Sequence, residues 1–79
     1  MAEAHSNLGY VYLNSGMYKE AIEACKQAIR IKPDMAEAHS NLGVAYLSLN
    51  YRGLALEQYK ILKDLDRQMA NELFNLIYK

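Results

Sequence analysis

The stretch Met1-Ala-Glu-Ala-His-Ser-Asn-Leu-Gly9 decides the fold, because the same nine residues return unchanged as Met35-Ala-Glu-Ala-His-Ser-Asn-Leu-Gly43, 34 residues later. Nine identities in nine positions identify an internal repeat. The same offset also pairs Tyr12 with Tyr46 and Ala21 with Ala55. This register predicts a first unit over residues 1–34, a second over 35–68, and a third copy over 69–79 that supplies one helix only.

Apolar residues within each unit recur at helical spacing, with one interruption. In the first unit Ala4, Leu8 and Val11 fall at i, i+4 and i+7, and we expect this stripe to face inward. Gly16 and Asn50 stand at equivalent positions in the two interruptions, and both residue types readily take the left-handed conformation that ends a helix. The pattern predicts an all-α fold with five helices, near residues 2–14, 18–31, 36–48, 52–65 and 69–78.

Several single residues refine this prediction. Pro33 ends the second helix, and Asp34, three residues before Glu37, predicts a capping box at the start of the third. Gly9 and Gly43 stand in mid-helix, where glycine costs about 1 kcal/mol relative to alanine. We therefore expect the paired helix to approach closely at both glycines.

These residues resemble the signature of the tetratricopeptide repeat. The first unit carries Asn7-Leu8-Gly9, Tyr12, Ala21, Ala28 and Pro33, and the second carries Asn41-Leu42-Gly43, Tyr46, Ala55 and Tyr59. Residues 69–79 resemble the capping helix of the family, whereas Leu62 and Arg67 replace its expected alanine and proline. The resemblance implies a right-handed α-solenoid whose first helices line a concave groove that binds a peptide or a partner helix.

Candidate binding residues lie on the side of the first helices opposite the apolar stripe. They are Glu3, Ser6, Asn7, Tyr10 and Asn14, then Glu37, Ser40, Asn41, Val44 and Ser48, and in the cap Asn71, Phe74, Asn75 and Tyr78. The three asparagines that recur every 34 residues predict a ladder of amides able to hold the backbone of a peptide. The alternative is that each asparagine bonds to a neighbouring helix, and the sequence leaves both open.

The charge of this surface predicts its ligand. Some members of the family clamp a terminal carboxylate with lysine and arginine, but Ser6 and Tyr10 occupy the first of those places and no basic residue lines the groove. We expect instead a neutral or basic ligand, because Glu3 and Glu37 are the charged candidates.

Composition argues against other classes of function. Nine basic and nine acidic residues cancel, which disfavours nucleic acid and membrane partners. Cys25 is the only cysteine, so we expect no disulfide, a small core residue and a reducing, cytoplasmic setting. His5 and His39 make a poor metal site, and no residue pattern predicts catalysis or a cofactor.

The two ends of the chain suggest a second function. Most of the circumference of helix 69–78 is apolar, and Arg67 leaves no strong helix breaker between residues 65 and 69. If helices 52–65 and 69–78 fused, the cap could cover a second copy and give a swapped dimer. The alternative to a peptide-binding module is therefore a self-associating fragment or engineered scaffold, with contacts through the cap or the first-repeat face.

Overall fold

The computed structural model describes all 79 residues and contains five helices and no strand, which confirms the all-α helical repeat. The helices are α1 (Ala2–Asn14), α2 (Tyr18–Ile31), α3 (Ala36–Ser48), α4 (Arg52–Leu65) and α5 (Arg67–Ile77). The first four have the predicted bounds, and α5 begins two residues and ends one residue earlier than expected. None of the five is long and apolar enough to cross a membrane.

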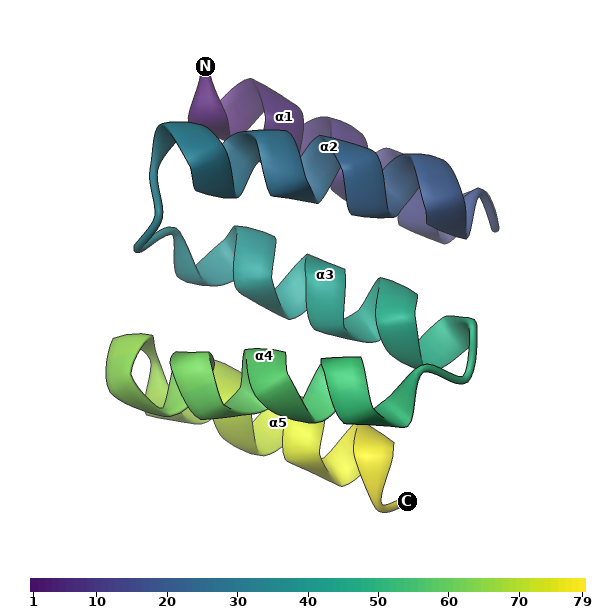
Figure 1. Cartoon of the computed structure of the whole chain (residues 1–79), viewed down its shortest axis with the longest axis vertical. Helices are drawn as coiled ribbons and strands as arrows, with labels where there is room; N and C mark the ends of the chain where they lie inside the picture. The colour runs from purple at the N-terminus through teal and green to yellow at the C-terminus, as the bar shows by residue number, and fades with distance from the viewer.

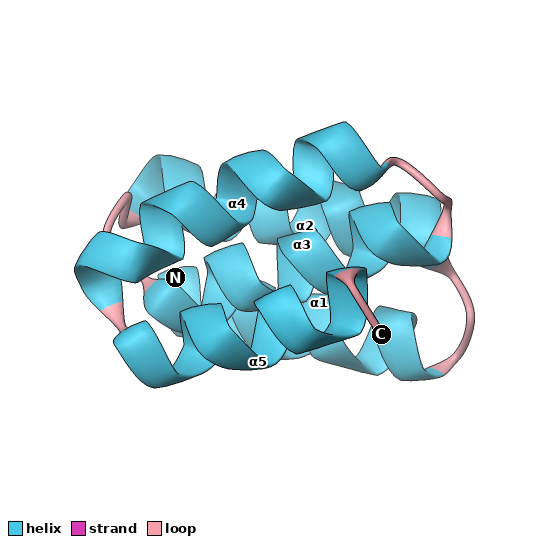
Figure 2. Ribbon diagram, turned by 90° about the horizontal axis from the view of Figure 1, so that it is seen from below, coloured by secondary structure: helices cyan, strands magenta, loops and turns pink.

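The helices follow one another along the long axis of a molecule of 30 × 25 × 16 Å. The α1–α2 pair lies at one end, α3 in the middle and the α4–α5 pair at the other end (Figure 1). Seen from below, α5 and α4 lie on opposite sides of the molecule, and α1 lies on the side of α5 (Figure 2). The first helices of the first and third units therefore share one side, and α3, the first helix of the second unit, contacts both of them.

The turns after α1 and α3 have the same geometry, as their equivalent positions predicted. Gly16 has φ 75° and Asn50 has φ 68°. The backbone N–H of Met17 donates to Tyr12 O at 2.9 Å, and that of Tyr51 donates to Tyr46 O at 2.8 Å. Asparagine tolerates the left-handed conformation better than most residues with a side chain, which explains how it replaces glycine here.

The predicted capping box at Asp34 is wrong. The residue that precedes α3 is Met35, and no side chain caps this helix. Met35 is buried in a small cluster with Ala28 and Ala38. This apolar contact places the start of α3 at Ala36, so Asp34 stands one residue too early to accept from the first helical turn.

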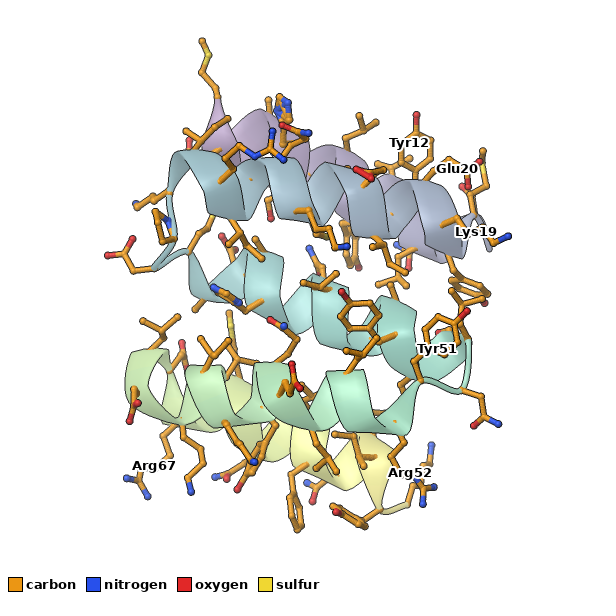
Figure 3. The ribbon with its side chains drawn as sticks, viewed as in Figure 1. Tyr12, Lys19, Glu20, Tyr51, Arg52 and Arg67 are labelled. Carbon is orange, nitrogen blue, oxygen red and sulfur yellow. The ribbon has the colours of Figure 1, made fainter.

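Helices α4 and α5 are separate, so the fused-helix alternative is wrong in this structure. The chain is extended at Asp66, with φ −156° and ψ 102°, and the Asp66 carboxylate accepts a hydrogen bond from the backbone N–H of Met69 at 3.0 Å. Arg67 points away from the helices (Figure 3). An aspartate N-cap thus begins α5 one residue before Arg67, which stands where the family places a proline, and α5 folds back onto α4.

The main core surrounds α3 and is closed by α5. Its buried side chains come from α2, α3, α4 and α5, whereas α1 contributes none. Cys25 of α2 is fully buried in it, as expected of a small core residue. The members are Cys25, Leu42, Tyr46, Ala55, Leu62, Ala70, Leu73 and Ile77.

Both mid-helix glycines permit the close approach of another helix. A Cβ atom on Gly9 would lie 2.6 Å from Cys25 Sγ on the paired helix α2, as predicted. A Cβ atom on Gly43 would lie 2.6 Å from Leu73 Cδ2, which belongs to α5. The paired helix α4 also approaches, since the same Cβ atom would lie 3.4 Å from Gln58 Cβ, so the expected approach is present and the closer contact of α5 adds to it.

The expected inward stripe of α1 is also wrong. Ala4, Leu8 and Val11 are exposed, whereas the equivalent Ala38, Leu42 and Ala45 of α3 are buried. The physical reason is that α2 packs against α3, but no helix packs against the corresponding face of α1.

Candidate functional site

A pocket of about 310 Å³ opens where α1, α3 and α5 meet. Its lining comes from the first helices of the three units. Six of its seven lining residues are candidates from the sequence, and the seventh is Met69. The lining consists of Ser6, Asn7 and Tyr10 from α1, Glu37, Ser40 and Asn41 from α3, and Met69 from α5.

Helical spacing explains how these side chains reach one hollow. The residues at 6, 7 and 10 occupy one face of α1, and those at 37, 40 and 41 occupy one face of α3, since positions three and four apart are neighbours on a helix. Helices α1 and α3 contact one another directly, so the two faces meet. The structure therefore brings together residues that are more than 25 positions apart in the chain.

Asn41 is tied to the scaffold, whereas the other two asparagines of the predicted ladder are not. The Asn41 Nδ2 group donates to the backbone carbonyl of Ser6 at 3.4 Å and so links α3 to α1. Asn7 and Asn75 are exposed, and their amide groups make no hydrogen bond within the chain. The alternative role, a bond to a neighbouring helix, thus applies to Asn41.

The serines and the tyrosine differ in exposure. Ser6 is buried, contrary to the exposed position expected for it, because it lies at the contact between α1 and α3. Ser40 is half-buried. Tyr10 is 55% exposed, and its ring offers a large apolar surface at the pocket. Exposed aromatic side chains of this kind are favoured contact residues at protein interfaces.

The pocket carries one charge. Glu37 is exposed and is the only aspartate, glutamate, lysine, arginine or histidine of the lining. The lining therefore combines a carboxylate, carboxamides and hydroxyl groups, all able to accept hydrogen bonds.

The remaining candidates lie outside this pocket. Glu3 is exposed, and Val44 packs against the main core. Phe74 stacks between Tyr78, with ring centroids 4.8 Å apart, and Tyr59 of α4, at 5.3 Å. The two cap aromatics thus belong to a row shared with α4.

The titratable residues of the interior have structural roles. The ring of the buried His39 uses both nitrogens: Nδ1 lies 2.7 Å from Gln58 Oε1 and Nε2 lies 2.8 Å from Pro33 O. Burial raises the pKa of the Cys25 thiol to about 11, so this group stays protonated at neutral pH. A protonated buried thiol is a poor nucleophile.

Sequence reasoning missed Met69 as a pocket residue. The signal was present in the repeat register, because Met69 occupies the position of Met1 and Met35. In the second unit that position contributes to the small core cluster, and in the third it reaches the pocket.

Comparison with known proteins identifies one family. The family model described as tetratricopeptide repeat matches residues 2–35, which include α1, α2 and the turn between them. Helices α3 and α4 repeat the same arrangement with the same nine-residue start. No curated protein matches the chain.

Proposed function

From the premise that the chain belongs to the tetratricopeptide repeat family, whose repeats generally mediate protein–protein interactions, we propose that its α1–α3–α5 pocket binds a peptide segment or helix of a partner protein. The occupant lies across the first helices of the two units and reaches the cap at Met69. The protein acts as a binding module and not as a catalyst, in keeping with a family that is generally non-enzymatic.

The observation that supports this proposal is the convergence of six candidate residues in one pocket. The family resemblance implied that the first helices line a groove, and helical spacing and repeat register selected these residues on them, three from α1 and three from α3. A concave surface with a few convergent polar groups is the usual form of a binding site.

The chemistry of the lining favours an occupant that offers hydrogen-bond donors and no net negative charge. Asn7 has an unused carboxamide that can pair with a peptide group of any sequence. Glu37 attracts a basic side chain and repels a carboxylate. Tyr10 supplies apolar contact. We therefore propose a neutral or basic segment and argue against recognition of a C-terminal carboxylate.

A peptide-array screen followed by titration of a selected peptide tests the proposal. Tyr10→Ala should weaken binding by about 1 kcal/mol or more, as expected for a central aromatic contact. Val11→Ala is the matched control, because Val11 is the next residue of α1 and is also 55% exposed, but lies outside the pocket. Its effect on affinity should be negligible.

Asn7→Ala separates the binding role from the structural one better than Asn41→Ala. Removing the Asn41 amide also removes its bond to Ser6 O, whereas the Asn7 amide has no bond to lose. We expect Asn7→Ala to weaken peptide binding with no change in thermal stability. Equal affinity for the unmodified chain, Tyr10→Ala and Asn7→Ala would refute the pocket as the binding site.

Self-association is the second proposed function, and it is supported by exposed apolar side chains at both ends. Leu8 and Val11 are exposed on α1, Phe74 and Leu76 are exposed on α5, and Tyr78 is exposed just after it. Molecular mass measured by light scattering over a wide concentration range distinguishes the two functions. A constant monomer mass favours the binding module, and a mass that rises without any ligand favours the self-associating scaffold.

A further inference from the structure

One face of α1 repeats a face of α3 that another helix covers. We call it the α1 outer face and define it by Met1, Ala4, Leu8 and Val11. In α3 the residue equivalent to Leu8 is Leu42, which is 3% exposed, whereas Leu8 is 45% exposed. Met1 and Met35 differ in the same way, at 76% and 7%. Identical residues are thus buried in one unit and open in the other.

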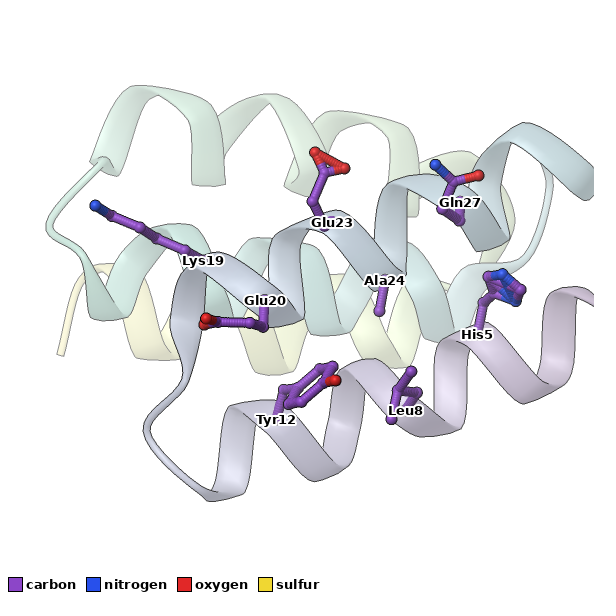
Figure 4. Close-up of a pocket in the computed structure, with 8 residues that line it drawn as sticks. All are labelled: His5, Leu8, Tyr12, Lys19, Glu20, Glu23, Ala24 and Gln27. Atoms are coloured by element: carbon purple, nitrogen blue, oxygen red, sulfur yellow. The ribbon is translucent and has the colours of Figure 1, made fainter.

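The α1 outer face continues into the largest pocket of the molecule, of about 520 Å³. His5, Leu8 and Tyr12 of α1 form one wall, and α2 forms the other (Figure 4). Glu20 and Glu23 stand on the α2 wall, and Lys19 extends from its amino-terminal turn (Figure 4). On the α1 wall Leu8 and Tyr12 are apolar and His5 is polar, and the rim carries two carboxylates and one ammonium group. The hollow is distinct from the α1–α3–α5 pocket and shares no lining residue with it.

The second unit shows what kind of structure fills this space. There α2 lies over α3, and its Ile22, Cys25 and Ile29 pack in the cluster that contains Leu42 and Tyr46. The covering helix is amphipathic, with this apolar stripe at i, i+3 and i+7 and charged residues elsewhere. The covering element runs antiparallel to the helix it covers (Figure 1).

The covering segment also supplies a polar contact. The carbonyl oxygen of Pro33, just after the end of α2, lies 2.8 Å from Nε2 of the equivalent histidine, His39. In the first unit His5 Nδ1 lies 3.1 Å from Met1 O, and His5 Nε2 has no partner. The equivalent face of α3 is contacted by an apolar stripe and by a carbonyl group, and the α1 outer face has neither contact.

We infer that the α1 outer face docks an amphipathic helix of a partner protein that carries the apolar pattern of α2. The helix runs antiparallel to α1 and places its carboxyl-terminal carbonyl groups over His5. Basic residues beside its apolar stripe face Glu20 and Glu23, a charge complementarity that selects against acidic helices. The partner helix would pack on α1 in the way that α2 packs on α3.

The probe is a fluorescein-labelled peptide with the sequence of residues 17–34, titrated with the full chain in reducing buffer and followed by fluorescence anisotropy. We expect saturable binding of one peptide per chain. The same peptide with Ile22→Glu and Ile29→Glu should bind at least about tenfold more weakly, because its apolar stripe is interrupted.

Chain variants locate the site of this binding. Leu8→Glu should weaken binding at least about tenfold, since it places a charge on the contact surface. Leu54→Glu is the matched control: Leu54 is 42% exposed, close to Leu8, but lies on α4. It should stay within about twofold of the unmodified chain, as expected of a residue outside the interface. Val11→Ser is a second variant of the face, and circular dichroism confirms that each variant folds.

Three results would overturn the inference. The first is no saturation up to about 1 mM peptide, a limit that corresponds to negligible affinity for an interface of this kind. The second is binding that survives both Leu8→Glu and Val11→Ser, as would occur if the peptide displaced α2 from α3. The third is a dimer of the unmodified chain that Leu8→Glu dissociates, because the occupant would then be a second copy and not a partner helix.

Discussion

Replacing Asp66 by alanine should destabilise the protein through loss of the α5 cap. The Asp66 carboxylate accepts from the N–H of Met69 at 3.0 Å and stands at the one helix of the five with a side-chain cap. Helix α5 closes the core with Ala70, Leu73 and Ile77, so weakening its start weakens the whole fold.

The size of the effect follows from the geometry. Loss of an aspartate N-cap costs about 1 kcal/mol, with a range of roughly 0.5–2 kcal/mol. In a domain of 60–100 residues each kcal/mol lowers the melting temperature by about 4–8 °C. We therefore expect Asp66→Ala to lower Tm by about 5 °C at neutral pH. Asp66→Asn keeps an acceptor oxygen and should lose much less.

Thermal unfolding followed by circular dichroism at 222 nm, a standard wavelength for helix content, measures this difference. Asp64→Ala is the control, because Asp64 is exposed in the last turn of α4 and makes no side-chain hydrogen bond. It should change the free energy of unfolding by less than about 0.5 kcal/mol. Equal Tm values for Asp66→Ala and the unmodified protein, or an equal loss for Asp66→Asn, would refute the capping argument.

Three further predictions follow from the core. Gly43→Ala should lower Tm, because the new Cβ atom would lie 2.6 Å from Leu73 Cδ2. Gly53→Ala should instead raise the free energy of unfolding by up to about 1 kcal/mol, since no atom lies within 4 Å of a Cβ atom at that position. The Tm values of both variants check this pair, and a stabilised Gly43→Ala would contradict it. Leu62→Ala restores the alanine of the family but should lower the free energy of unfolding by about 2–5 kcal/mol, because Leu62 is fully buried. Urea denaturation measures this change, and a loss below about 1 kcal/mol would contradict the prediction. The pKa of Cys25 is raised from 9.0 to about 11, so the folded state holds the thiol proton more tightly than the unfolded state. The stability that the protonated Cys25 thiol contributes is complete below pH 9 and is lost as the pH rises towards 11. Over that pH range the free energy of unfolding of Cys25→Ala should therefore fall less steeply than that of the unmodified protein. Equal slopes for the two proteins would contradict this prediction.

The repeat register predicted most of the fold because helix formation and turn geometry are local properties. Spacing of apolar residues gave the bounds of the first four helices, and Gly16 and Asn50 gave the left-handed turns. The start of α5 was missed by two residues, since Asp66 was not recognised as its cap. The hydrogen bond from Met69 N–H to the Asp66 side chain spans only three residues. An aspartate three residues before Met69 is thus a local signal that could have predicted the start of α5.

The burial of α1 could not be predicted from its own residues. Leu8 and Leu42 stand in identical nine-residue segments, yet one is exposed and the other buried. The difference comes from α2, which packs on α3 and has no counterpart over α1. Identity of sequence therefore fixes the helix but not its neighbours, and neighbours decide which apolar residues form a core.

The same division between local and long-range contacts decided which parts of the candidate site could be predicted. Residues on one face of α1 and one face of α3 were correctly grouped, because helical spacing decides which side chains share a face. The row of Tyr59, Phe74 and Tyr78 was not foreseen, since it depends on how α5 folds back onto α4.

Chemical-shift mapping tests the central claim most directly. A ¹H–¹⁵N spectrum of the labelled chain is recorded with increasing amounts of a peptide selected on the array. Binding in the α1–α3–α5 pocket predicts the largest changes at Asn7, Tyr10, Ser40 and Asn41, including the side-chain amide signals of the asparagines. Changes confined to α4 and to the aromatic row of α5, with the pocket residues unmoved, would contradict the account.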